Sequence, residues 1–235
     1  MPSSDPIVIF GGFLSFPRLY SQMRAELARL TGLPVSQVPA YSHEWLATVS
    51  LAGCKLLLDK LDRAVRLAAR DSASGKVTLV AHSQGGVLAR LYLAPRAVFS
   101  RRYDGQQRTS RLVTLGSPHY SQGGLTRGGQ LTRYVQSHCP DACFDPPVRC
   151  TSVVGKIIKG SLLTTSHARW AYRRYAELCG DGAVWGDGII PLPSALIPGT
   201  QQLILDDVAH FTGLGTLWYG SPQVIPQWWY PAINA

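Results

Sequence analysis

Short apolar runs recur along the chain and alternate with segments of helical periodicity. The runs stop at Gly, Pro or polar residues and cover 7–10, 76–81, 111–115, 150–154 and 202–205. Short, largely apolar strands are typical of parallel sheets, because helices cover both faces of such sheets. Apolar residues three and four apart in 16–30, 51–70 and 85–93 predict the intervening helices. The alternation therefore predicts an α/β fold: a mostly parallel sheet with helices on both faces.

The chain has 235 residues, and neither an internal repeat nor a linker interrupts this pattern. We therefore expect a single domain over 1–235. Ligands bind beyond the carboxyl ends of strands in open parallel sheets, so we expect 119–180, after two strand ends, to contain lid and pocket-wall segments. Several apolar residues there are candidates either to hold a lipophilic chain or to pack in the core: Leu125, Leu131, Phe144, Ile157, Ile158, Leu162 and Leu163.

Charge and hydropathy narrow the classes of partner. The formal net charge is +9, but the basic residues are scattered, and the densest run is Arg101-Arg102. Nucleic-acid binding would call for a basic stripe, so we expect none. Contact with an anionic lipid surface fits a diffuse positive charge, and so does a merely solvated surface. No apolar stretch approaches the roughly 20 residues of a membrane span, and the polar segment 1–6 has no secretory-signal pattern.

The cysteines do not predict a metal site. There are five, at 54, 139, 143, 150 and 179, and an odd count argues against a complete disulfide framework. The Cys139-x₃-Cys143 spacing matches no zinc motif, so we expect no bound metal. One disulfide within 139–179 remains open for an oxidising compartment.

The sharpest motif is Ala81-His82-Ser83-Gln84-Gly85-Gly86, which follows a predicted strand and opens a predicted helix. This is the context of a nucleophile elbow, a tight turn that lifts a serine hydroxyl above the strand ends. The turn needs small residues two before and two after Ser83, and Ala81 and Gly85 meet that need. The plainer alternative is a serine that caps a helix. We predict Ser83 as the nucleophile.

An oxyanion hole needs two backbone donors near the nucleophile. One is expected from the Gln84 N–H, directly after Ser83. The second is expected from the loop after the first strand, Phe10-Gly11-Gly12-Phe13, where we assign the Phe13 N–H and expect Gly12 to lie against the substrate. The alternative is a Gly-Gly turn without a role.

The base and the acid should follow Ser83 in the order acid, then histidine. His210 comes after the last strand and is the predicted base. His119 also lies at a strand end, but it precedes any suitable acid, so we predict that it lines the pocket. His138 and His167 fall in weakly structured stretches and are expected to be solvated, and His82 is expected to point away.

Asp187, in Trp185-Gly186-Asp187-Gly188, is the predicted acid because glycines on both sides place the carboxylate on a tight turn. Asp181 has a similar setting and is the alternative. Asp206 and Asp207 are disfavoured because they lie so close to His210 in the sequence.

These residues resemble the lipase-like branch of the α/β-hydrolase fold, and the motif around Ser83 is similar to that of small bacterial lipases. Several segments further resemble a cyanobacterial and plant-type α/β-hydrolase family, near which algal chlorophyllase-like proteins belong. The resemblance spans most of 7–230 and departs at Gly11, where relatives often carry His or Pro. Its segments are 12–15, 79–83, 114–119, 185–188 and 218–222.

The resemblance implies acyl transfer through a Ser-Asp-His triad, with no metal or organic cofactor. We expect a serine carboxylic-ester hydrolase acting on lipophilic esters, and the resemblance points to the phytyl ester of chlorophyll or pheophytin. A general acylglycerol lipase or carboxylesterase is the alternative, and a catalytically silent scaffold of the same fold is a further one. The resemblance also suggests a plastid or the cytoplasmic side of a photosynthetic cell, while the residues themselves fix no localisation.

Overall fold

A six-stranded parallel sheet forms the centre of the molecule. The computed structural model describes residues 4–48, 50–122 and 127–234. The sheet order is β2-β1-β3-β4-β5-β8, and every neighbouring pair is parallel. The strands are β1 (Ile7–Phe10), β2 (Val35–Gln37), β3 (Val77–His82), β4 (Thr109–Leu115), β5 (Arg149–Lys156) and β8 (Gln201–Asp206).

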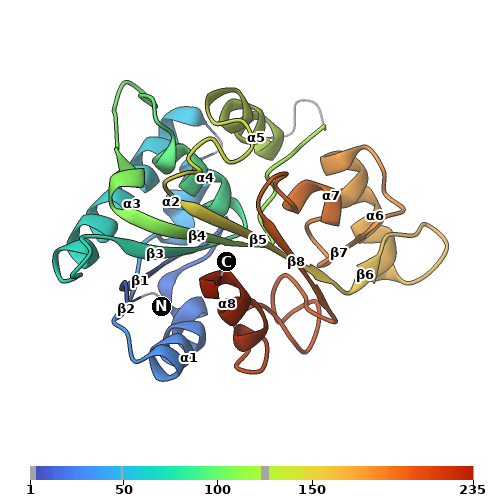
Figure 1. The fold of residues 1–235 in the computed structure, drawn as a ribbon. Coiled ribbons are helices and arrows are strands. Elements are labelled where there is room, and N and C mark those ends of the chain that lie inside the picture. Colours follow the sequence, from blue (N-terminus) through green and yellow to red (C-terminus); the bar gives the residue numbers. More distant parts are fainter. Residues whose placement is uncertain (1–3, 49, 123–126, 235) are drawn as a thin grey trace.

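Helices cover both faces of this sheet (Figure 1). On one face lie α1 (Ser21–Thr31) and α8 (Ile225–Asn234). The opposite face is covered by α2 (Ser42–Ala47), α3 (Leu51–Arg70), α4 (Gln84–Leu93) and α5 (Arg127–His138). This arrangement confirms the predicted fold class. The remaining elements are η1 (Pro17–Tyr20), η2 (Gly105–Gln107), β6 (Ile158–Lys159), α6 (Ser166–Cys179), β7 (Trp185–Gly186) and α7 (Leu192–Ala195).

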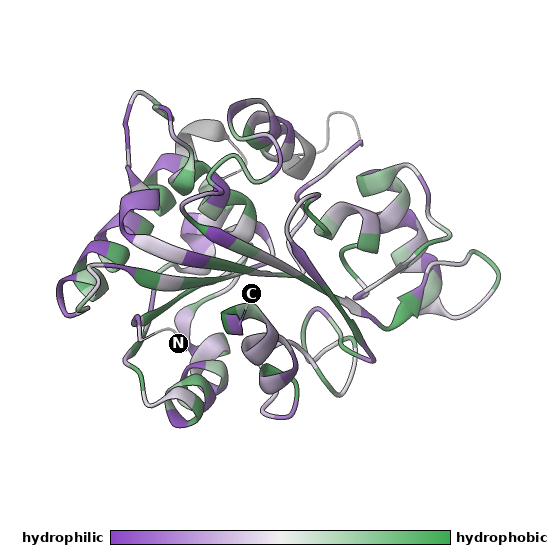
Figure 2. Cartoon of the chain, in the orientation of Figure 1, coloured by the Kyte–Doolittle hydropathy of each residue, from purple (hydrophilic) through white to green (hydrophobic). Residues whose placement is uncertain are grey.

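Each face of the sheet has its own hydrophobic core. All four residues of β1 and all six of β3 are buried, and Figure 2 shows hydrophobic residues along the central strands. Alternate β1 residues enter opposite cores: Val8 and Phe10 pack with the α3 side, and Ile7 and Ile9 pack with the α1 and α8 side. Burial on both faces is why these strands are mostly apolar, with only Thr78 and His82 as polar positions in β3.

The predicted elements appear with small changes in their bounds. The helix expected over 16–30 is divided, because Pro17 begins a 3₁₀ turn and α1 starts at Ser21; it ends before Gly32, whose φ of 68° suits glycine. The sequence pattern did not indicate α5 or α8. Two glycines interrupt the α5 sequence and Pro231 lies inside α8. Burial of Trp228 and Trp229 against the sheet stabilises α8 despite that proline.

Two of the five cysteines form a disulfide, Cys139–Cys143, while Cys54, Cys150 and Cys179 are free. Within the part of the chain that the structure describes, no cluster of His, Cys, Asp or Glu could hold a metal ion. No described helix is both long and apolar enough to cross a bilayer.

Candidate active site

Ser83 lies in a sharp turn between β3 and α4. Its φ of 55° and ψ of −131° are rare for a residue with a side chain. Close packing holds the turn: a Cβ added to Gly85 would lie 2.0 Å from the Gly11 carbonyl oxygen, and one added to Gly86 would lie 2.1 Å from Ser117 Oγ. Such a strand–turn–helix is the geometry of a nucleophile elbow.

The structure brings Ser83, His210 and Asp187 together from distant parts of the chain. His210 Nε2 lies 3.0 Å from Ser83 Oγ, and His210 Nδ1 lies 2.7 Å from Asp187 Oδ2. An ionised carboxylate only accepts hydrogen bonds, so His210 Nδ1 carries the proton and Nε2 accepts from the Ser83 hydroxyl. The His210 amide also donates to the Asp187 carbonyl at 2.9 Å, which couples the two loops. This geometry suits a nucleophile, a base and an orienting acid.

Asp187 is fully buried and its carboxylate oxygens are well supplied with donors. Oδ1 accepts from the amides of Ile189 at 3.0 Å and Ile190 at 2.7 Å. Oδ2 accepts from the Tyr219 hydroxyl at 2.7 Å, in addition to His210. The Tyr219 oxygen in turn accepts from the Gly155 amide at 2.8 Å. Tyr219 was not predicted as a site residue, because no local motif marks it, although 218–222 is one of the segments that carry the resemblance.

The alternative acids lie elsewhere. Asp181 is exposed and its Oδ1 accepts from the Ala183 amide at 2.8 Å. Asp206 pairs with Lys156 at 3.2 Å, and Asp207 is exposed at a φ of 59°. The geometry therefore favours Asp187 as the partner of His210.

The loop after β1 contacts Ser83 directly. A Cβ added to Gly12 would lie 2.6 Å from the Ser83 Cβ, so only glycine permits this approach. The Gly12 amide donates to the Tyr20 hydroxyl at 3.1 Å and is thereby occupied. Neither the Phe13 nor the Gln84 amide donates a hydrogen bond to another described residue. These two are the amides expected to form the oxyanion hole.

His82 lies beside the candidate base rather than in solvent. Its ring centroid is 4.6 Å from that of His210, and its Nδ1 lies 2.9 Å from the Tyr20 hydroxyl. Burial, reinforced by the neighbouring His210, holds the pKa of His82 well below its usual range. Burial also raises the pKa of Tyr20 to about 12. Tyr20 thus joins the Gly12 amide to a neutral His82, which adds no charge beside His210.

The expectation that His119 lines the pocket is not met. His119 is fully buried, its Nε2 lies 3.0 Å from Thr114 Oγ1, and it is absent from the described residues that line the cavity. Its strand-end position was predicted correctly, but its side chain packs beneath the surface of the site. His167 is exposed as expected, whereas His138 is half-buried and stacks on Tyr134 with ring centroids 3.9 Å apart.

A cavity of about 1030 Å³ opens over Ser83 and His210. Of the apolar residues proposed for its wall, Leu131 lines it; Phe144 belongs to the core, and Leu125 lies outside the described residues. The other four, Ile157, Ile158, Leu162 and Leu163, are absent from the described lining. Apolar lining that was not foreseen comes from Leu14, Leu19, Leu46, Val87, Leu178, Ile189, Ile190 and Phe211.

No protein-family model matches the chain, and no curated protein sequence matches it. Among solved structures it is similar to a hydrolase of the alpha/beta superfamily from Xanthomonas campestris, with 18% identity and a TM-score of 0.46 over 89% of this chain and 90% of that one. It is also similar to lipase B from Aspergillus fumigatus, with 10% identity and a TM-score of 0.45 over 64% of this chain and 37% of the lipase.

A cell surface hydrolase from Lactobacillus plantarum matches with 13% identity and a TM-score of 0.43, over 64% of this chain and 68% of that one. At these identities and TM-scores, the likenesses bear on no residue's role and on no substrate. The chain's own features agree with the α/β-hydrolase fold: a parallel sheet, an elbow after a central strand, and the chain order Ser, Asp, His.

Proposed function

We propose that the protein is a serine carboxylic-ester hydrolase that cleaves lipophilic esters. The observation that carries the proposal is the hydrogen-bonded series from Ser83 Oγ to His210 at 3.0 Å and on to buried Asp187 at 2.7 Å. Ser83, at the start of this series, lines a large apolar cavity. A surface serine that merely caps a helix needs neither partner.

The proposed reaction begins with attack of Ser83 Oγ on the ester carbonyl carbon. His210 Nε2 takes the hydroxyl proton, and Asp187 stabilises the resulting imidazolium through Nδ1. The amides of Phe13 and Gln84 donate to the carbonyl oxygen as it gains negative charge. His210 then returns the proton to the departing alcohol. A water molecule, deprotonated by the same nitrogen, cleaves the acyl-enzyme and restores Ser83.

The cavity supports a long apolar chain on one side of the ester. Its volume of about 1030 Å³ and its leucine-rich lining suit an acyl or isoprenoid chain. Within this class we propose the phytyl ester of chlorophyll or pheophytin, which rests on the family resemblance. Acylglycerol esters fit the same lining and are the alternative substrate.

The first experiment is trapping with a serine-reactive fluorophosphonate. The wild-type protein should be labelled once, and Ser83→Ala should not be labelled. Ser83→Ala should lower kcat for p-nitrophenyl esters by about 10⁴ to 10⁶ while the melting temperature stays close to wild type. Ser137→Ala, a change at an exposed serine on α5, is the matched control and should keep both labelling and turnover. Labelling that survives in Ser83→Ala would exclude Ser83 as the nucleophile.

The second experiment separates the substrate classes. A series of p-nitrophenyl esters of rising chain length, with chlorophyll a, pheophytin a and a triacylglycerol alongside, gives kcat/KM for each. Phytyl-ester cleavage should exceed acylglycerol cleavage, and the reverse order would favour the lipase alternative. A folded wild-type protein that is neither labelled nor active on any ester would be a scaffold.

A further inference from the structure

Two consecutive leucines stand at the tip of the loop that joins β6 to α6. The Leu163 side chain is 95% exposed and that of Leu162 is 50% exposed. Figure 1 shows this loop projecting at the end of the molecule farthest from β2. None of the described hydrophobic core clusters contains either leucine. Exposed apolar side chains that are neither core nor pocket lining mark an interaction site when other features support one.

Hydrogen bonds hold the backbone of this loop in one conformation, in which both leucine side chains are exposed. The Ser161 amide donates to the Ala168 carbonyl at 3.0 Å, and the Leu163 amide donates to Ser161 Oγ at 3.2 Å. Arg169 Nη1 donates to the Thr164 carbonyl at 3.0 Å, and Thr165 caps α6. These bonds tie both sides of the tip to the first turns of α6.

The segment that carries the two leucines is rich in basic residues. From residue 150 to residue 176 the sequence has no Asp or Glu, but it has the cations Lys156, Lys159, Arg169, Arg173 and Arg174. Lys156 and Arg174 pair with acids outside that stretch, at 3.2 Å and 2.8 Å. No salt bridge joins Lys159, Arg169 or Arg173 to a described carboxylate.

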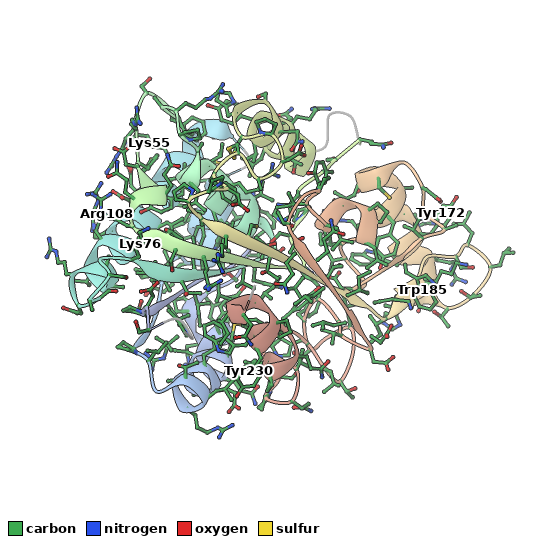
Figure 3. The ribbon with its side chains drawn as sticks, viewed as in Figure 1. Lys55, Lys76, Arg108, Tyr172, Trp185 and Tyr230 are labelled. Carbon is green, nitrogen blue, oxygen red and sulfur yellow. A yellow bond between two sulfur atoms is a disulfide. The ribbon has the colours of Figure 1, made fainter. Side chains whose placement is uncertain are left out.

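Two exposed tryptophans complete this end of the molecule. Trp170 lies on α6 between Arg169 and Arg173, all three of them on its exposed side. Trp185 pairs in register with Lys159 in the antiparallel β6–β7 pair, and Figure 3 shows it at the same end of the molecule. Tryptophan is enriched where protein meets the boundary between lipid headgroups and acyl chains.

We propose that the tip, defined as residues 159–173, docks the protein on an anionic phospholipid bilayer. Leu162 and Leu163 enter the acyl region, while Lys159, Arg169 and Arg173 face the negative headgroups. A bilayer fits a narrow projection better than a protein partner, because a fluid acyl layer needs no matching pocket and the surrounding cations need only negative charge.

Docking would also bring the proposed active site near its substrate. The C-terminal half of α6 supplies Arg174, Glu177 and Leu178 to the cavity wall, so one short helix joins the tip to the cavity. The proposal goes beyond ester hydrolysis and does not depend on it, because the tip contains none of the candidate catalytic residues.

The test is vesicle co-sedimentation in the Ser83→Ala background, which leaves the lipids intact and makes binding independent of catalysis. The probes are vesicles of phosphatidylcholine alone and of phosphatidylcholine with phosphatidylglycerol. Binding should be stronger to the anionic vesicles and should fall with salt. Leu162→Ser/Leu163→Ser should weaken it by about tenfold or more, the scale expected for two inserted leucines. Lys159→Gln/Arg173→Gln should weaken binding to anionic vesicles only.

Leu67→Ser is the matched control, because Leu67 is 62% exposed on α3, outside the tip. It should bind as the parent does, and circular dichroism should show that every variant is folded. Equal binding by the double-leucine variant, or equal loss in Leu67→Ser, would overturn the proposal. A wild-type dimer in sedimentation velocity that dissociates in the double-leucine variant, without vesicle binding, would assign the tip to a second copy instead.

Discussion

Two buried histidines should make the protein lose stability in mild acid. Burial holds the pKa values of His82 and His119 well below the usual range for histidine. The neighbouring His210 adds to this effect at His82, and Arg90 adds to it at His119. In the unfolded chain both titrate near about 6.5. Below that pH the unfolded state binds protons that the folded state does not.

The sign follows from this difference in bound protons. The contribution is fully present above about pH 6.5 and is lost as the pH falls toward the lowered folded-state pKa values. At pH 5.5, one unit below the unfolded value, each histidine costs up to roughly 1 kcal/mol, so the pair costs up to roughly 2 to 3 kcal/mol of unfolding free energy. That is a large part of the free energy of unfolding of a typical folded protein, which is roughly 5–15 kcal/mol.

The measurement is urea unfolding at pH 7.5 and pH 5.5, followed by circular dichroism. His119→Gln keeps a polar group near Thr114 Oγ1 but does not titrate, so the change in its unfolding free energy between the two pH values should be smaller than that of wild type by roughly 1 kcal/mol. Val153→Ala, a buried truncation without a titratable group, is the control and should lower stability equally at both pH values. A His119→Gln variant with the full wild-type pH difference would refute the reasoning.

Two further predictions concern Asp187. Asp187→Asn should lower kcat for ester hydrolysis by about 10⁴, because the amide no longer selects the required His210 tautomer. Asp181→Asn, a change at an exposed residue, should keep the wild-type kcat. A larger loss in Asp181→Asn than in Asp187→Asn would show that the acid is wrongly assigned. Tyr219→Phe removes a donor to Asp187 and leaves the Gly155 amide without its acceptor, so it should lower kcat and also reduce the unfolding free energy by about 1–3 kcal/mol. Wild-type stability in urea would contradict the second expectation.

The central strands could be predicted from the sequence because burial on both faces makes them largely apolar. β1 and β3 lie where the apolar runs place them, and α3 follows its apolar spacing from 51 to 70. α8 could not be predicted, because its stability comes from tertiary burial of Trp228 and Trp229 and from the bond between Trp228 Nε1 and the Tyr219 carbonyl at 2.9 Å. Local propensity carries no sign of such contacts.

The same distinction separates the predicted site residues from the missed ones. The residues around Ser83 are local in sequence, so the tight turn itself demands their types. Tyr20 and Tyr219 reach His82 and Asp187 across 62 and 32 residues, and nothing in the local pattern of either tyrosine indicates its partner. For His119, the sequence predicts the position of the backbone at a strand end. It does not predict whether the side chain faces the cavity or the core, because that depends on tertiary packing.

The strain at Ser83 is held by contacts from two neighbouring segments, the loop after β1 and the end of β4. A left-handed residue with a side chain costs about 1–3 kcal/mol, yet the Ser83 amide is fixed to the Leu115 carbonyl at 2.9 Å. Neither Gly12 nor Gly85 has a positive φ. Glycine is needed at both positions because there is no room for a Cβ atom. An added methyl group at either would push the β1 loop away from the turn. That loop carries the Phe13 amide, so the packing that strains Ser83 also sets the distance between the proposed nucleophile and its proposed oxyanion donor.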